Sequence, residues 1–86
     1  MIRIVFIPAF LRQFEKLDSE LRDDALEKVE AFKDRANHAR LRVHKLRGPL
    51  AGQSSFSVNY KYRIVFQYVS RDEAVLLAIG DHDVYE

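Results

Sequence analysis

The chain has no cysteine among its 86 residues, which excludes a disulfide framework and any metal site built on thiolates. Long apolar runs are missing as well. The apolar residues near the start are interrupted by Pro8 and Arg12, so they are too short for a signal sequence or a membrane-spanning helix. We therefore expect a cytoplasmic protein without membrane association. A chain of this length predicts a single domain over residues 1–86.

Acidic residues are absent from one long segment, Arg35–Arg63. All thirteen aspartates and glutamates lie outside it, although the formal net charge of the chain is only +1. The segment holds seven of the fourteen lysines and arginines, namely Arg35, Arg40, Arg42, Lys45, Arg47, Lys61 and Arg63. Because phosphates respond to the local field rather than to the net charge, this distribution indicates a surface that binds a polyanion.

The first half of the chain predicts one strand and two helices. Ile2–Ile7 is rich in β-forming residues and predicts a strand. A helix is expected over Ala9–Leu17, where apolar residues recur at helical spacing. Asp18 or Ser19 is the expected N-cap of a second, amphipathic helix that runs to about Arg35. The short link between the two helices predicts an antiparallel helical hairpin.

The second half predicts mainly strands. Leu41–Leu46 alternates between apolar and polar residues and is compatible with a short strand, followed by a glycine- and proline-containing loop to about Ser54. Strands are expected over Ser55–Tyr60 and Tyr62–Tyr68, joined by a tight turn. Ala74–Ile79 is nearly all apolar, which predicts a strand covered on both faces.

The resulting element order, β-α-α-β-β-β, predicts an α+β fold. In this arrangement the helical hairpin packs on one face of a mainly antiparallel sheet. The opposite face would remain free to bind a ligand. Arg63 and Asn59 belong to the polar sides of neighbouring strands, so we expect them to project from that free face.

Several kinds of catalytic and cofactor site lack their sequence signals. Asp81-His82-Asp83 comes nearest to a metal site, but three adjacent ligands do not converge on one ion without a special turn. The glycines at positions 48 and 52 lack the helix and the Lys-Ser/Thr ending of a phosphate-binding loop. No serine is marked as an activated nucleophile. We therefore expect neither a metal nor an organic cofactor.

The remaining polar residues suit the cleavage of an RNA phosphodiester. That reaction needs a base for the 2′-hydroxyl proton, an acid for the leaving 5′-oxygen, and cations for the developing charge. Imidazole serves either proton-transfer role near neutral pH, and guanidinium matches two phosphate oxygens. His44, His82 and Arg63 come from three segments that a folded sheet could bring together, and Tyr85 could stack on a base.

Plainer interpretations exist for most of these residues. His44 is also compatible with an ordinary surface histidine, and Tyr85 with packing of the tail. Lys45, Arg47 and Lys61 are also compatible with solvated charges. His38 lies at an expected helix end, where a cation complements the helix dipole, and we interpret it as structural.

An ordered set of short motifs over essentially the whole chain resembles the RelE/ParE superfamily of bacterial toxin–antitoxin toxins. The motifs are Leu46-Arg47-Gly48, Gly52, Tyr62-Arg63-Ile64-Val65-Phe66 and Ile79-Gly80-Asp81-His82-Asp83-Val84-Tyr85. The resemblance implies the RelE-like fold with the same element order. It further implies one of two activities: RelE-like branches cleave messenger RNA on the ribosome, and the ParE branch inhibits DNA gyrase. A cognate antitoxin neutralises such toxins in a hetero-oligomer.

The resemblance also implies roles for individual residues. Arg63 matches the arginine at the scissile phosphate, and Tyr85 matches the terminal aromatic near the leaving nucleotide. His82 and His44 resemble histidines of YafQ-type members, which suggests His82 as general acid and His44 as a possible base. The residues expected to contact ribosomal or messenger RNA are Lys45, Arg47, Lys61 and Asn59.

The sequence departs from the family patterns at several positions. RelE uses lysines on the strand before the Tyr-Arg pair, where this chain has Ser57 and Asn59. YafQ-type toxins carry a histidine near Ser57 and an acid near Lys61, and both are missing here. A tryptophan of many relatives is replaced by Ser55. These differences leave two alternatives to an endoribonuclease toxin: a non-enzymatic gyrase inhibitor, or a degraded toxin that only binds its antitoxin.

Overall fold

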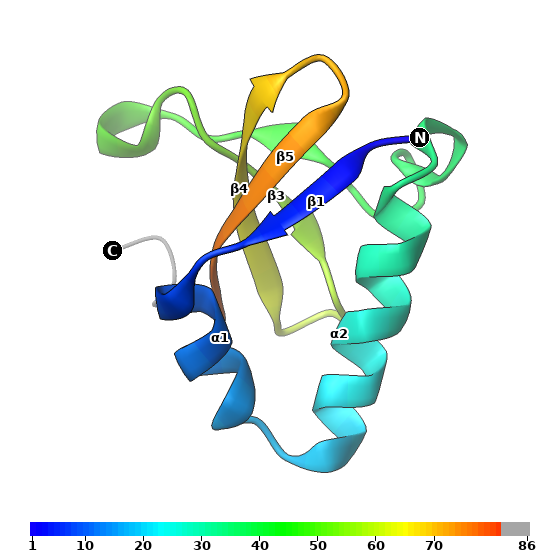
Figure 1. Ribbon diagram of the computed structural model, residues 1–86, viewed down its shortest axis with the longest axis vertical. Coiled ribbons are helices and arrows are strands. Elements are labelled where there is room, and N and C mark those ends of the chain that lie inside the picture. The colour runs from blue at the N-terminus through cyan, green and yellow to red at the C-terminus, as the bar shows by residue number, and fades with distance from the viewer. Residues whose placement is uncertain (82–86) are drawn as a thin grey trace.

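The computed structural model describes residues 1–81, in which α-helices lie beside one five-stranded sheet (Figure 1). The strands follow the order β1-β5-β4-β3-β2 across the sheet. Within residues 1–81, β1 and β5 are parallel and the other neighbours are antiparallel. The elements are β1 (Arg3–Phe6), α1 (Pro8–Glu15), α2 (Ser19–Phe32), η1 (Arg35–Asn37), β2 (His44–Lys45), η2 (Gly48–Leu50), β3 (Ser54–Ser57), β4 (Arg63–Ser70) and β5 (Glu73–Gly80). The predicted α+β architecture is confirmed.

The ends of the two helices follow from local chemistry. Pro8 occupies the first turn of α1, where its missing N–H has no helical partner to lose. Asp18 is the N-cap of α2, and its carboxylate accepts the backbone N–H of Leu21 at 2.9 Å. Figure 1 shows α1 and α2 running in opposite directions, as the short link predicts.

Helix α2 ends at Phe32, about one turn earlier than the sequence predicts, because side chains bind its last carbonyl groups. The Asn37 amide donates to the Ala31 carbonyl at 2.9 Å. The His38 Nε2–H donates to the Phe32 carbonyl at 2.7 Å, and the imidazole stacks on the Phe32 ring at a centroid distance of 4.7 Å. These bonds satisfy carbonyls that a longer helix would have paired.

The hydrophobic core lies between the helices and the sheet and centres on three phenylalanines. Phe32 stacks on Phe56 at 4.5 Å and meets the edge of Phe66 at 4.7 Å, measured between ring centroids. Helix α1 is tied to the sheet by Gln13, whose Oε1 accepts the Ile79 N–H at 2.9 Å. The buried core residues are Ile2, Phe10, Ala25, Val29, Phe32, Leu41, Phe56, Val58, Ile64, Phe66, Ala74, Leu76 and Ile79.

Two of the expected strands are shorter than predicted. The strand expected over Leu41–Leu46 is reduced to His44–Lys45, because Arg42 adopts a left-handed backbone with φ of 58°. The strand expected over Ser55–Tyr60 stops at Ser57, where the chain enters a turn. In β5, buried residues alternate with half-buried ones and none is exposed, so one face is fully covered as predicted and the other is covered in part.

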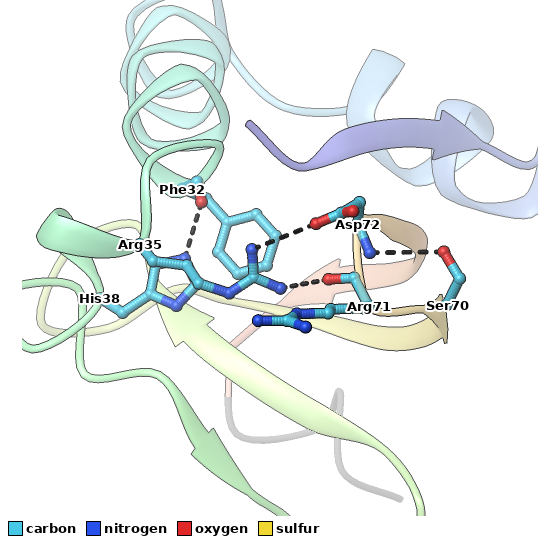
Figure 2. A network of polar contacts seen from close by, with 6 residues as sticks. All are labelled: Phe32, Arg35, His38, Ser70, Arg71 and Asp72. Atoms are coloured by element: carbon cyan, nitrogen blue, oxygen red, sulfur yellow. Dashed lines mark hydrogen bonds and ion pairs between the residues drawn. The ribbon is translucent and has the colours of Figure 1, made fainter.

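Arg35 holds the turn between β4 and β5 against the end of α2, as Figure 2 shows. Its Nη2 donates to the Arg71 carbonyl, and its Nη1 lies 3.7 Å from the Asp72 carboxylate. The Asp72 backbone N–H donates to Ser70 Oγ at 3.3 Å, which tightens the same turn. No helix within residues 1–81 combines the length and apolarity needed to cross a lipid bilayer.

Candidate nucleic-acid interface

The sheet face opposite the core carries a set of polar side chains. His44 pairs with Ser55 across β2 and β3, and Ser57 pairs with Arg63 across β3 and β4. Side chains alternate along a strand, so these residues share the face opposite to Phe56, which is buried in the core. The prediction that Arg63 projects from the open face therefore agrees with the strand register.

Arg63 lines a pocket of about 230 Å³, here called the Arg63 pocket. Its lining residues are Arg40, Arg42, Ser57, Asn59, Tyr60 and Arg63, so three of them are arginines and, within residues 1–81, none is acidic. Arg63 is half-buried, and its Nη1 donates to Ser57 Oγ. This hydrogen bond fixes the direction of the guanidinium without neutralising its charge.

The Arg63 pocket keeps its positive charge within the part of the chain that the structure describes. Within residues 1–81, no ion pair involves Arg40, Arg42 or Arg63. Arg40 donates one hydrogen bond to the neutral Asn37 side chain at 3.1 Å, and both Arg40 and Arg42 are exposed. A guanidinium presents a rigid fork of donors that matches two phosphate oxygens, so the pocket suits a phosphate group.

His44 lies on the same face but outside the Arg63 pocket. Its Nδ1 is 2.9 Å from the Arg42 carbonyl oxygen, and its Nε2 is 3.5 Å from Ser55 Oγ. A carbonyl only accepts hydrogen bonds, so Nδ1 carries the proton and Nε2 carries the lone pair in the neutral ring. His44 is two strands and two residues away from Arg63, which corresponds to about 12 Å between Cα atoms.

Asn59 lines the Arg63 pocket, and its side chain stabilises the turn that follows β3. Asn59 Oδ1 accepts the backbone N–H groups of Lys61 and Tyr62 at 2.8 and 2.7 Å, which confirms the predicted tight turn. Tyr60 is 93% exposed, whereas alternation along the expected strand Ser55–Tyr60 would place its side chain on the same face as that of Phe56. Its phenol ring is therefore a pocket wall that sequence reasoning missed.

The remaining predicted RNA contacts lie outside the Arg63 pocket. Lys45 follows His44 on β2 and pairs with Ser54, so its side chain belongs to the opposite sheet face. Arg47 is exposed at the start of η2. The Lys61 ammonium lies 5.8 Å from the centroid of the Tyr62 ring.

Two predicted catalytic residues, His82 and Tyr85, lie outside the described residues 1–81. The chain position that precedes them is defined, since Gly80 ends β5 and pairs with Arg63. Within residues 1–81 there is no group of three histidine, aspartate or glutamate side chains that could hold a metal ion.

Arg40, Arg42, Ser57 and Tyr60 are pocket residues for which the sequence supplied no individual assignment. The absence of acids over Arg35–Arg63 did signal the two arginines as part of a basic surface. The absence of acids could not distinguish Arg40 and Arg42 from the other cations of the segment, because the residue pattern does not reveal the left-handed turn at Arg42.

Comparison with known proteins gives a consistent structural result. No protein-family model matches the chain, and no curated protein matches it by similarity. Among solved structures, a chain of the toxin–antitoxin complex RelBE2 from Mycobacterium tuberculosis has a TM-score of 0.77 and 21% identity, covering 94% of this chain and 98% of that one. The YoeB–YefM complex of Staphylococcus aureus gives 0.72 and 16%, with 95% and 98% covered.

YafQ of Escherichia coli gives a TM-score of 0.71 at 11% identity, with 99% of this chain and 98% of YafQ covered. The similarity thus extends over complete chains rather than over a shared fragment. It also spans several types of toxin with this architecture. The chain therefore has the RelE-like fold, which is the fold of RelE-, YoeB- and YafQ-type toxins of bacterial toxin–antitoxin systems.

Proposed function

We propose that the protein is the toxin of a type II toxin–antitoxin system and cleaves messenger RNA on the ribosome. The observation that carries this proposal is the Arg63 pocket, which Arg40, Arg42 and Arg63 line together, with no acidic residue of positions 1–81, on the sheet face opposite the helices. Three positively charged arginine side chains can pair with the negative charges of one phosphodiester and of the phosphates next to it in the RNA chain. The RelE-like fold of the chain supports the same activity.

The proposed reaction is an intramolecular transfer at phosphorus. The ribose 2′-oxygen attacks the adjacent phosphorus as a base removes its proton, and a pentacoordinate phosphorane forms. The bond from phosphorus to the 5′-oxygen then breaks, and that oxygen takes a proton from an acid. The products are a 2′,3′-cyclic phosphate and a 5′-hydroxyl. Arg63 would stabilise the negative charge that develops on the non-bridging oxygens.

His44 is assigned as the base in this proposal. The lone pair on Nε2 is the group that would accept the 2′-hydroxyl proton, because Nδ1 is bonded to the Arg42 carbonyl. A phosphodiester that bridges from Arg63 toward His44 must lie across β3, beside Ser57 and Ser55. Ser55 is fully buried and Ser57 is half-buried, so of these two hydroxyl groups only that of Ser57 is placed to contact a sugar-phosphate chain.

The sequence-based assignments complete the proposed site. His82 follows Gly80 by two residues, and Gly80 pairs with Arg63 on the neighbouring strand. We assign His82 as the general acid for the 5′-oxygen and Tyr85 as a stacking partner for a base. Lys45, Arg47 and Lys61 would contact the RNA backbone.

A cognate antitoxin is the proposed protein partner, as in the RelBE2 and YoeB–YefM complexes. It would cover an apolar groove of about 130 Å³ between β1, α1 and α2, lined by Phe6, Phe10, Leu11, Phe14 and Leu26. Leu11 and Leu26 are 41% and 47% exposed and line the same groove, so they belong to a contiguous apolar patch that a partner could cover. Exposed acids of α2 flank Leu26, so the matching antitoxin segment should be apolar with a basic rim.

Primer extension on a reporter messenger RNA tests this function. Purified protein is incubated with the message, with and without programmed ribosomes, and an Arg63→Ala variant serves as control. We expect cuts at codon-related positions only with ribosomes and only with the unmodified protein. Cuts without ribosomes would contradict the proposed substrate. If no cuts appear, a gyrase supercoiling assay distinguishes a ParE-like inhibitor from an inactive toxin.

A further inference from the structure

A second polar hollow lies on the opposite side of the sheet from the Arg63 pocket. It has a volume of about 320 Å³ and is lined by Lys45, Leu46, Gly52, Gln53, Ser54 and Tyr68; we call it the Tyr68 hollow. Its volume falls in the range of about 300–1,000 Å³ that is usual for small-molecule sites. The size therefore suits a ligand such as one nucleotide.

The strand register separates the Tyr68 hollow from the proposed catalytic face. Lys45 pairs with Ser54, and Ser54 pairs with Phe66, which is buried in the core. Residues in one row of a sheet share a face, so the hollow belongs to the face that carries the helices. His44 and Lys45 are consecutive in β2, an edge strand, and therefore point to opposite faces of the sheet.

Tyr68 offers an aromatic surface in this hollow. Its side chain remains 39% exposed although it meets the edge of Phe66 at a centroid distance of 5.2 Å. The Arg35 guanidinium carbon lies 5.9 Å from the centroid of the Tyr68 ring. Arg35 is itself held by the Arg71 carbonyl and the Asp72 carboxylate, as Figure 2 shows, so this cation stays beside the ring.

The other lining groups complement a nucleotide. Gln53 carries an amide with both donors and acceptors for the edge of a base, and Ser54 adds a hydroxyl group; both residues are half-buried. Lys45 supplies an exposed ammonium for a phosphate. Among residues 1–81, no aspartate or glutamate lines the hollow, and the Asp72 carboxylate already faces Arg35.

From this combination we infer that the Tyr68 hollow binds one unpaired nucleotide of RNA, with the base against Tyr68 and Gln53 and the phosphate at Lys45. Aromatic stacking of unpaired bases beside basic side chains is the common mode of single-stranded RNA recognition. The inference deepens the proposed function, since it rests on RNA being the substrate. RNA would then contact both faces of the sheet around the β2 edge.

An NMR titration tests the inference with a six-nucleotide single-stranded RNA and the full-length Arg63→Ala protein, which would leave the RNA intact. We expect the RNA to shift the backbone amide signals of Gln53, Ser54 and Tyr68. A Lys45→Ala, Gln53→Ala double variant should weaken this response at least fivefold. Lys16→Ala, which removes an exposed cation from the end of α1, should leave it unchanged.

Two outcomes would overturn the inference. Shifts confined to the surroundings of Arg40, Arg42 and position 63 would mean that the hollow binds no RNA. Equal affinity for an abasic six-unit ribose-phosphate chain would mean that only charge is recognised. Both results are independent of ribosome-dependent cleavage, so they are distinguishable from a failure of the proposed function.

Photo-crosslinking to programmed ribosomes identifies the source of the nucleotide. With the Arg63→Ala protein, an adduct between the Tyr68 peptide and the message would assign the hollow to messenger RNA. An adduct with the ribosomal RNA would assign it to the ribosome itself. Crosslinks of this peptide to ribosomal protein alone would contradict the inference.

Discussion

The Nδ1 atom of His44 lies 2.9 Å from the carbonyl oxygen of Arg42, two residues earlier in the chain. Arg42 has a left-handed backbone with φ of 58°, and this conformation directs its carbonyl toward the imidazole. The same residue contributes its guanidinium to the Arg63 pocket. This one turn thus orients both His44, a potential base, and Arg42, a potential phosphate ligand. Neither residue type indicates from the sequence that the backbone adopts a left-handed conformation here.

This hydrogen bond makes a prediction about His44. His44→Ala should reduce cleavage by about 10²–10⁴-fold, the usual contribution of a general base. Because the side chain is exposed, the free energy of unfolding should change by no more than about 0.5 kcal/mol. Single-turnover cleavage on programmed ribosomes and thermal unfolding measure the two effects. Undiminished cleavage by the variant would remove His44 from the mechanism.

Arg63 should be required as a planar fork of donors and not only as a positive charge. Arg63→Lys keeps the charge but loses the paired donors, so single-turnover cleavage should still fall by about 10²-fold. Ser57→Ala removes the acceptor that orients Arg63 and should have a smaller effect, about tenfold. Arg12→Ala, a change on the exposed surface of α1, is the matched control. Full activity of Arg63→Lys would show that charge alone suffices.

Arg42 permits a test that separates backbone strain from charge. Arg42→Gly removes the guanidinium and tolerates a positive φ, whereas Arg42→Ala retains the strained backbone. We expect Arg42→Gly to be at least as stable as Arg42→Ala. In both variants, the slope of log affinity against log salt for single-stranded RNA should decrease by about 0.7, the effect of one lost phosphate contact. An unchanged slope would mean that Arg42 does not contact the backbone.

The architecture could be predicted from the sequence because it follows from periodic apolar residues. The spacing in Ala9–Leu17 and the cap at Asp18 depend on neighbours in the chain, and both features are present at nearly the expected residues. The early end of α2 depends instead on bonds from Asn37 and His38 to its last carbonyls. Side chains here compete with backbone N–H groups for the last carbonyl groups of the helix, and the spacing of apolar residues does not reveal such competition.

The site was predictable only in part, for a related reason. Arg63 interrupts an apolar strand, so its exposure on a polar face could be inferred from alternation. The other arginines of the pocket could not be inferred in this way. Arg40 and Arg42 reach the pocket through a turn whose left-handed residue is Arg42 and not a glycine, so the sequence does not mark the turn. Asn59 was expected on a strand as an RNA contact. Its side-chain Oδ1 instead accepts two backbone N–H groups of the turn after β3. His82 and Tyr85 remain predictions, since they lie outside residues 1–81.

The apolar groove predicts a selective defect in neutralisation. Leu26→Lys places a charge on an exposed groove position, so affinity for the proposed antitoxin should fall at least tenfold. Cleavage by the free protein should be unchanged, because Leu26 lines neither the Arg63 pocket nor the Tyr68 hollow. Val69→Lys makes the same change at a 57% exposed position of β4 outside the groove and should bind normally. Tight co-purification of Leu26→Lys would exclude the groove as the antitoxin site.

His38 should behave in the opposite way to His44. Its Nε2–H bonds to the carbonyl of Phe32 at 2.7 Å, and its ring stacks on the ring of Phe32 at 4.7 Å, as Figure 2 shows for the hydrogen bond. His38→Ala loses both contacts, which should lower the free energy of unfolding by about 1–2 kcal/mol.

Cleavage by the molecules that remain folded should nevertheless be unaffected by His38→Ala, because the ring packs against the end of α2 rather than on the open sheet face. Denaturant unfolding and active-site-normalised cleavage distinguish the two histidines. His38→Gln, which can restore a hydrogen bond but not the stacking, should recover part of the lost stability. A His38→Ala protein that is fully stable but inactive would reverse the assignment and place His38, not His44, in the reaction.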